Sequence, residues 1–250
     1  MNKLIYHCVC CLVCYMCGWQ PLSAQHLTIG QLTSYPFPSE LATAATGNRM
    51  AVAINEQGRR NLYVAEGPTF ELRKLTVYDA DLGDEITSVQ LSEDGQWIVY
   101  VKGGDHGGSN ASTPRNPASL PVATKVQVWS IPFSGGKPAL LGDGDNPAIS
   151  PVGDRVAFIR QGQVWVCPID GSGKPEQLFH ARGQNGAIRW SPDGKGMAFV
   201  SSRGGHSLVG IFRDPGTPIQ WIAPNYARDG SPRWSPDGTR ITFIRRDAAG

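Results

Sequence analysis

The sequence has little charge, few methionines and almost no cysteine after its first 24 residues. Charged residues make up 18% of the 250 residues, the formal net charge is +2, and there is no long run of Lys or Arg. A nucleic-acid-binding face needs clustered basic side chains, so we expect no nucleic-acid partner. After residue 24 there is also no apolar stretch that approaches the roughly 20 residues needed to cross a bilayer.

The first 24 residues differ in composition from the rest. Lys3 provides a positive start, and an apolar stretch runs from Leu4 to Trp19. Ser23 and Ala24 supply small residues before a cleavage near Gln25, although Leu22 is larger than such sites prefer. The pattern predicts a signal peptide over residues 1–24 and export to the periplasm or the extracellular space. An uncleaved membrane anchor and a lipoprotein are the alternatives, and we expect no membrane contact beyond this leader.

Cysteine is nearly confined to that leader. Five of the six cysteines lie there, which leaves Cys167 alone in the exported part, where no internal disulfide can form. The leader cysteines resemble a metal or redox box in spacing, but cysteine in an apolar leader acts as a small hydrophobic residue. Cys167 stands in an alternating apolar run, which favours a half-buried strand position over a reactive thiol.

Motifs that carry catalysis or bind cofactors are also missing. The sequence has no Gly-x-Ser-x-Gly nucleophile elbow, no phosphate-cradling Gly-rich loop and no EF-hand spacing. The carboxylates of the acidic stretch from Asp79 to Glu85 could bind a hard cation such as Ca²⁺, but the stretch lacks EF-hand spacing. We therefore predict that it is an inter-blade turn. The histidines that follow the leader are scattered over predicted turns and loops: His26, His106, His180 and His206. We therefore expect no catalytic residue, no cofactor and no metal site.

An internal repeat dominates the remainder of the chain. The segments Arg189–Phe199 and Arg233–Phe243 both read Arg-Trp-Ser-Pro-Asp-Gly and continue into an apolar run. A third copy spans Ile149–Phe158, a fourth spans Leu91–Tyr100, and a degenerate fifth spans Ala44–Val52. The turn glycines of the five copies are Gly47, Gly95, Gly153, Gly194 and Gly238, which stand 48, 58, 41 and 44 residues apart.

Each repeat predicts four antiparallel strands. Ser-Pro-Asp-Gly favours a β-turn, because Pro fixes φ, the Asp side chain hydrogen-bonds to the nearby backbone and Gly adopts a positive φ. The strand after this turn is apolar on both faces, which is typical of a strand buried from both sides. A tight hairpin such as the one at Gly162 leads to a second strand, and a Gly- or Pro-bearing turn leads to a short further one. Four strands in every 40 to 45 residues is typical of a propeller blade.

The sequence therefore predicts an all-β fold, a β-propeller of four-stranded antiparallel blades in which about four and a half blades are present. A β-sandwich is the competing fold, but it would not explain the recurrent turn. The predicted blades span residues 36–78, 86–142, 143–180 and 184–223, with an incomplete one at 229–250, inside a partial propeller of residues 25–250. The repeat's aromatic residues are expected in the inter-blade core: Phe158, Trp190, Phe199, Trp234 and Phe243.

The Trp-Ser-Pro-Asp-Gly units followed by Met-Ala-Phe or Ile-Thr-Phe resemble the WD40-like repeats of TolB-type propellers and of the N-terminal propellers of prolyl oligopeptidase family serine peptidases. The resemblance covers residues 36 to 250. A long Gly-rich insertion from Val101 to Asn110, continuing to Ala118, looks like the second-blade insertion of secreted dipeptidyl or acylaminoacyl peptidases. TolB propellers lack that insertion.

This resemblance implies a non-catalytic propeller that gates peptide substrates over an α/β-hydrolase domain which is absent from this chain. Because the last blade is unfinished at Gly250, we expect the chain to be the N-terminal piece of a longer peptidase. The alternative is a TolB-like periplasmic propeller that recruits protein partners and performs no chemistry. In either case the innermost strands and the insertion would carry the recognition residues, for which the candidates are Asp105, His106, Asn146, Arg189 and Arg233.

Overall fold

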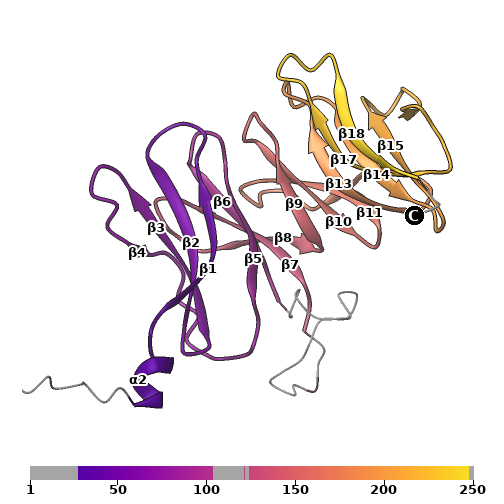
Figure 1. Ribbon diagram of the computed structural model, residues 1–250. Helices are drawn as coiled ribbons and strands as arrows, with labels where there is room; N and C mark the ends of the chain where they lie inside the picture. The colour runs from indigo at the N-terminus through magenta and orange to yellow at the C-terminus, as the bar shows by residue number, and fades with distance from the viewer. Residues whose placement is uncertain (1–27, 104–120, 122–123, 248–250) are drawn as a thin grey trace, which may run out of the picture. The chain divides into compact units, whose positions relative to one another are not determined.

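The computed structural model describes residues 28–103, 121 and 124–247 (Figure 1). The chain divides into two compact units, residues 1–35 and 36–250. Within the described part of the first unit, helix α2 (Ile29–Thr33) begins at a capping box, because the Thr28 hydroxyl accepts from the Gln31 N–H and the Gln31 side chain accepts from the Thr28 N–H. The predicted signal peptide, residues 1–24, lies outside the described residues.

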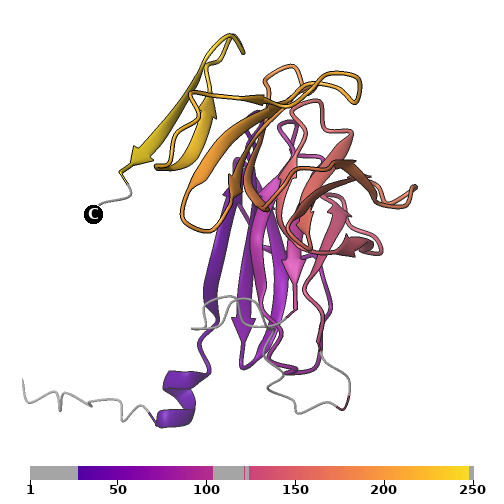
Figure 2. The same ribbon diagram turned by 90° about the vertical axis from the view of Figure 1, so that its right-hand side faces the viewer.

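The second unit consists of antiparallel sheets in which strands adjacent in sequence pair with each other. Figures 1 and 2 show these sheets following one another in chain order, from indigo to yellow. The strands of the first two sheets are β1 (Phe37–Thr43), β2 (Arg49–Glu56), β3 (Arg59–Glu66), β4 (Arg73–Lys74), then β5 (Ile86–Leu91), β6 (Trp97–Lys102), β7 (Gln127–Pro132), β8 (Ala139–Asp143). The next two sheets comprise β9 (Asp145–Ile149), β10 (Arg155–Arg160), β11 (Gln163–Pro168), β12 (Glu176–Phe179), then β13 (Gln184–Trp190), β14 (Met197–Ser202), β15 (Ser207–Phe212), β16 (Gln220–Trp221).

A last pair of strands, β17 (Arg228–Trp234) and β18 (Ile241–Arg246), begins a further blade. One parallel bridge between Ser207 and Arg228 connects it to the fourth sheet. The first strand of every sheet contacts the first strand of the next, from β1 to β5, β9, β13 and β17. Sheets that meet along their first strands are the blades of a propeller, with those strands innermost. The predicted all-β propeller with an incomplete last blade is confirmed.

Three hydrophobic clusters lie between successive blades, and strand β6 shows how they form. Ile98 and Tyr100 belong to the cluster shared with blade 1, whereas Val99 and Val101 belong to the cluster shared with blade 3. All four side chains are fully buried. Since successive strand residues point to opposite faces, a run without polar residues is buried only if neighbours cover both faces. Burial of each such side chain stabilises the fold by about 1.5–3 kcal/mol.

The third cluster lies between blades 3 and 4, where it includes Ala157 of β10. In it, the ring of Phe179 from β12 lies tilted against that of Phe199 from β14, with ring centroids 4.6 Å apart. Phe158 and Phe199 are fully buried, as expected for inter-blade core. Trp190 packs against the third cluster while partly buried. The expectation for the last copy is wrong, since Trp234 and Phe243 are only partly buried and belong to none of the three clusters. Blade 5 has only two described strands to cover them.

The repeated turn joins the first two strands of each blade through a small hydrogen-bond network. In blade 4, the Ser191 hydroxyl donates to Asp193 Oδ1 and accepts from the Gly196 N–H, and Asp193 Oδ1 also accepts from the Lys195 N–H. Gly194 takes φ +69 and its N–H donates to the Ser191 carbonyl. Blades 2 and 5 repeat the network around Asp94 and Asp237, whereas the equivalent position is Thr46 in blade 1 and Val152 in blade 3.

The predicted hairpin at Gly162 is a two-residue turn in which Gln161 and Gly162 both have positive φ, 50° and 69°. Two positive φ values are the signature of the type I′ turn, whose twist matches that of the flanking strands. This turn sets the register of β10 against β11, from Arg155 opposite Pro168 to Arg160 opposite Gln163. It thereby places Phe158 and Cys167 in the same inter-blade cluster.

Candidate ligand-binding site on the innermost strands

The innermost strands share a kink at one repeat position. Seven residues before each turn glycine of blades 2 to 5 stands a non-Gly residue with positive φ: Ser88 (53°), Asn146 (52°), Ala187 (46°) and Ser231 (53°). The antiparallel pairing shifts by a β-bulge in each of these blades. A bulge re-aims the side chains that follow it, and bulges with left-handed residues are frequent beside functional sites.

Two residues after each kink comes a second shared position of the innermost strands. It holds Gln90, Ala148, Arg189 and Arg233 in blades 2 to 5. Gln90 Nε2 donates to the Pro147 carbonyl of the next blade at 2.7 Å. The innermost strands are therefore tied to one another by side-chain to main-chain bonds as well as by apolar packing.

Two tryptophans make the reverse connection. The indole N–H of Trp190 donates to the Ala148 carbonyl of blade 3 at 3.0 Å, and that of Trp234 donates to the Arg189 carbonyl of blade 4 at 3.1 Å. Both tryptophans hold the same repeat position, so one contact recurs between successive blades. It fixes the main chain at Ala148 and at Arg189.

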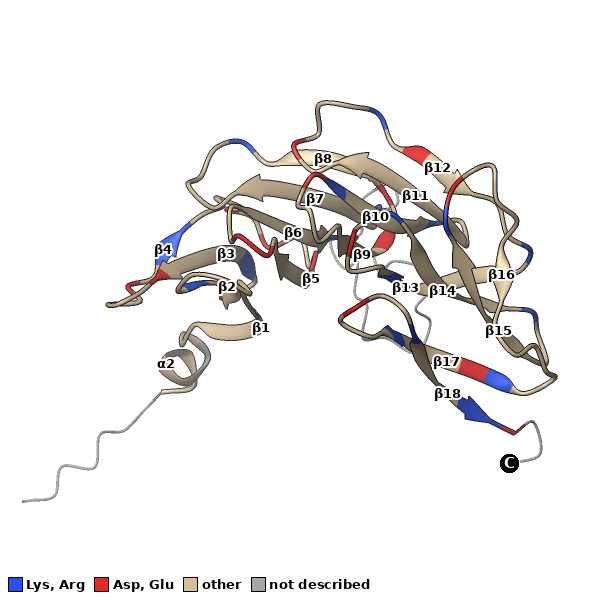
Figure 3. Ribbon diagram, turned by 90° about the horizontal axis from the view of Figure 1, so that it is seen from above, with Lys and Arg blue, Asp and Glu red and all other residues tan. Residues whose placement is uncertain are grey.

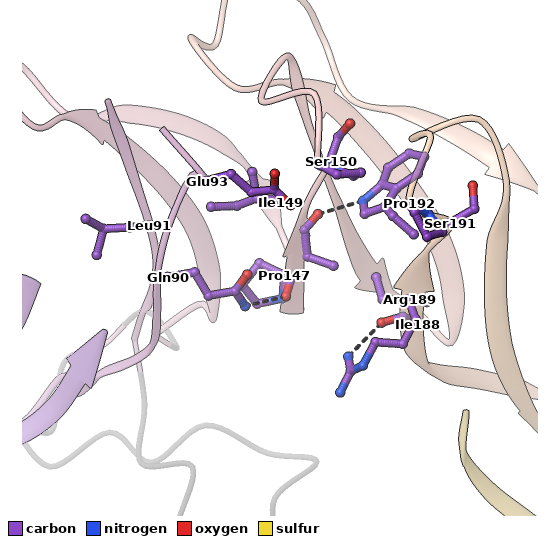
Figure 4. A pocket seen from close by; sticks show the side chains of 13 residues that line it. Gln90, Leu91, Glu93, Pro147, Ile149, Ser150, Ile188, Arg189, Ser191 and Pro192 are labelled. Carbon is purple, nitrogen blue, oxygen red and sulfur yellow. Dashed lines mark hydrogen bonds between the residues drawn. The ribbon is translucent and has the colours of Figure 1, made fainter. Parts of the chain in front are cut away.

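A cavity of about 590 Å³ opens on these strands (Figure 4). This volume is within the range of small-molecule and peptide pockets. Blades 2, 3 and 4 all contribute to its lining, which mixes prolines and apolar residues with a few polar groups. The lining residues are Gln90, Leu91, Glu93, Pro147, Ala148, Ile149, Ser150, Pro151, Ile188, Arg189, Trp190, Ser191 and Pro192.

Two positive charges lie at the blade 4 and blade 5 side of this region. Arg189 lines the cavity and Arg233 occupies the equivalent place on the neighbouring strand β17. Arg189 is exposed as a residue, but partial desolvation of its guanidinium lowers the pKa of that group, and the positive charge of Arg233 lowers the pKa further. Each guanidinium donates through Nη1 to a carbonyl of its own strand, Arg189 to Ile188 at 2.7 Å and Arg233 to Pro232 at 2.9 Å. Within the described residues, neither forms an ion pair with a carboxylate.

The structure brings together two of the five predicted site residues. Arg189 and Arg233 interact electrostatically, while Asn146 is exposed at the β9 bulge, where its N–H donates to Asp145 Oδ1 at 2.6 Å. Asp105 and His106 lie outside the described residues. Sequence reasoning missed Gln90 and Trp190 as lining residues; counting back from each turn glycine would have placed both on the same edge as Arg189.

The other polar groups considered from sequence are engaged elsewhere. In the acidic stretch, Asp81 faces Arg60 at 3.6 Å and Asp84 binds Lys102 at 2.8 Å. Over the part of the chain that the structure describes, no three His, Cys, Asp or Glu side chains come together as a metal site would require. The same part contains no helix with the length and apolarity to cross a membrane. The Cys167 thiol is buried, which raises its pKa.

No family model and no curated protein matches this sequence. Solved structures do match. A putative TolB from Agrobacterium tumefaciens superposes with a TM-score of 0.55 at 22% identity, over 86% of this chain and 72% of that one. The fold that this chain shares with the putative TolB is a β-propeller. A puromycin-hydrolyzing peptidase from Mycobacterium tuberculosis matches this propeller at TM-score 0.59 and 18% identity, over 84% of this chain and 35% of the peptidase.

A structure from a study of two prolyl endopeptidases matches this propeller at TM-score 0.54 and 12% identity, over 79% of this chain and 31% of that one. The chain thus spans about a third of the length of both peptidases and nearly three quarters of the putative TolB. At these identities the likeness establishes the fold. Any functional inference therefore has to come from the geometry of the innermost strands.

Proposed function

We propose that this propeller is a non-catalytic binding module that takes peptide segments on its innermost strands. The observation that carries the proposal is the cavity of about 590 Å³ that three successive blades line together. Its walls combine Pro147, Pro151 and Pro192 with polar groups such as Gln90 and Arg189. Apolar walls with a few polar groups suit a peptide, whose side chains need apolar contacts and whose main chain needs hydrogen bonds.

The finer form of the proposal is substrate gating in an exported serine peptidase. The propeller would sit with an α/β-hydrolase domain encoded beyond this chain and admit peptides to it. The structural likeness to the two peptidases, each about three times as long as the matched part, supports this form. Reading the gene beyond codon 250 tests it, because a Gly-x-Ser-x-Gly elbow in or out of frame is expected within the next few hundred codons. A gene without that elbow contradicts the gating form.

The TolB-like form is the second candidate, and the 72% coverage of the putative TolB favours it. In this form the exported propeller recruits a protein partner in the periplasm and no hydrolase domain follows. Both forms agree that the chain performs no chemistry itself. The purified 250-residue chain is therefore expected to hydrolyse no peptide or ester, and hydrolysis blocked by a serine-directed inhibitor would contradict both forms.

Hydrogen–deuterium exchange locates the binding surface directly. The full chain is incubated with and without a mixture of short random-sequence peptides. We expect added protection in the innermost strands β9 and β13, with the outer strands of the same blades, β12 and β16, unchanged as internal controls. Protection that is confined to the outer strands would contradict the proposal. The absence of any added protection in the presence of the peptides would contradict it as well.

A further inference from the structure

We propose that Arg189 and Arg233 act together as a carboxylate-binding pair, which makes the propeller selective for peptides that present a carboxylate to its innermost strands. This inference rests on the proposed peptide-binding function and specifies its ligand. The shared chemistry is the carboxylate, which an acidic side chain or a peptide C-terminus can supply.

The fold places the two arginines at equivalent points of neighbouring strands. Both stand five residues before a turn glycine, Gly194 and Gly238. Each follows a bulge, and each resumes regular pairing with the second strand of its blade, Arg189 opposite Ala198 and Arg233 opposite Thr242. Strands β13 and β17 are in contact, and Trp234 holds the Arg189 carbonyl at 3.1 Å. The pair is thus set by main-chain geometry rather than by flexible loops.

Other arginines of the blades form ion pairs with carboxylates, and Arg189 and Arg233 do not do so among the described residues. Arg49 forms an ion pair with Glu66 at 2.8 Å, and Arg245 on β18 holds Asp229 through two bonds of 2.7 and 2.8 Å. Arg189 and Arg233 have no such acid among the described residues. Two adjacent cations without a counter-charge raise each other's electrostatic energy, and an anion between them lowers it.

The donors that remain suit a carboxylate. A guanidinium carries five N–H groups, and each of these two uses one on its own strand. The rest can form the parallel pair of bonds that guanidinium makes with a carboxylate. Arg189 also lines the cavity, so a carboxylate held there leaves the rest of an extended peptide against Pro147 and Trp190.

Equilibrium binding to three labelled peptides tests the pair with the full chain. The first is Gly-Gly-Glu-Gly-Glu-Gly amide, the second has Gln in place of Glu and an amide end, and the third has Gln and a free C-terminal carboxylate. We expect the first or the third to bind more tightly than the second. Which of the two does so identifies the source of the carboxylate. The advantage should shrink as salt is raised.

Substitutions then assign the effect to the pair. Arg189→Gln and Arg233→Gln are each expected to weaken the carboxylate peptide about tenfold and to leave the all-Gln amide unchanged, since each removes charge-assisted bonds to the carboxylate alone. Arg182→Gln removes an exposed charge from the segment between blades 3 and 4 and is the matched control, with no expected effect. Arg189→Lys keeps the charge and is expected to recover part of the affinity, which separates binding from a folding defect.

Two outcomes overturn this inference. One is equal binding of all three peptides, and the other is a carboxylate preference that survives in the double variant. In both cases peptide binding itself persists, so the proposed function stands while the pair loses its role. If none of the peptides binds and the random mixture gives no exchange protection, the proposed function falls together with the inference.

Discussion

The indole N–H of Trp190 donates to the Ala148 carbonyl at 3.0 Å, and its counterpart Trp234 makes the same bond to Arg189 at 3.1 Å. Each bond joins two innermost strands that lie more than 40 residues apart in sequence. The guanidinium of Arg155 stands over the Trp190 ring at 4.9 Å and donates to the Gly194 carbonyl at 3.0 Å. A blade is therefore held to the next at its inner edge and at its turn.

We expect Trp190→Phe to lower the free energy of unfolding by about 1 kcal/mol through the loss of this bond, in addition to a smaller loss of packing. Trp129→Phe is the matched control, because the Trp129 indole N–H is buried and has no hydrogen-bond partner among the residues that the structure describes. The Trp129→Phe substitution loses buried ring surface, but it also removes a buried N–H that lacks a hydrogen-bond partner among the described residues. Urea unfolding followed by circular dichroism measures both variants. A larger loss for Trp129→Phe would contradict the importance of the inter-blade bond.

The turn carboxylates predict an acid-sensitive contribution to stability. Hydrogen bonds from Ser92, Ser191 and Ser235 lower the pKa of Asp94, Asp193 and Asp237 below the ordinary value of 3.8. A carboxyl with a lowered pKa in the folded state contributes stability above its ordinary pKa and loses it as the pH falls through the folded pKa. The urea midpoint should therefore decline below pH 3.8 less steeply in the triple Asp→Asn variant than in the unmodified chain.

Ser191→Ala provides the check on the cause. The Ser191 hydroxyl is the largest influence on the Asp193 pKa, so its removal should raise that pKa toward the ordinary value in a carbon-detected NMR titration. Asp237 keeps Ser235 and serves as the internal reference. An Asp193 pKa that does not move would show that the main-chain donors alone hold the carboxylate.

Blade 3 offers a stabilising substitution. Val152 is 62% exposed and stands where the turns of blades 2, 4 and 5 place an Asp that accepts from a Ser hydroxyl. Val152→Asp should complete the network with Ser150 and raise the free energy of unfolding by about 0.5–1 kcal/mol, as repeat-consensus changes commonly do. Val152→Asn keeps the shape with a weaker acceptor and should gain less. A thermal denaturation midpoint that falls for Val152→Asp would refute the equivalence of the turns.

Two glycines on neighbouring strands test how tightly blade 4 is packed. A Cβ at Gly210 would meet the Phe199 ring at 2.7 Å and the Trp221 ring at 2.9 Å, whereas a Cβ at Gly230 has no atom within 4 Å. Gly210→Ala should therefore cost about 1–3 kcal/mol through overpacking. Gly230→Ala is expected to be neutral or slightly stabilising, because it restricts the unfolded chain without a clash. Equal unfolding free energies for the two variants would contradict the observed packing.

The peculiar composition of the repeat explains why so much of the fold could be read from sequence. Ser-Pro-Asp-Gly specifies its own turn through local bonds, and the pairs Ile98 with Tyr100 and Val99 with Val101 demand neighbours on both faces of one strand. Local chemistry and alternation thus determined the blades. Trp234 and Phe243 are less buried than expected, because their burial depends on further strands that pack over them. The position of a residue in the repeat does not show whether such strands are present.

The candidate site depended on the assembled blades. Ser88 and Ala187 give no local signal for a left-handed kink, since the φ of a non-Gly residue at a bulge is imposed by the pairing of the strand rather than by its own side chain. The sequence alone determined that Arg189 and Arg233 hold the same place in their repeats. Only the tertiary structure decided that their strands are in contact and that neither arginine pairs with an acid among the described residues, because that depends on how two separate blades are stacked.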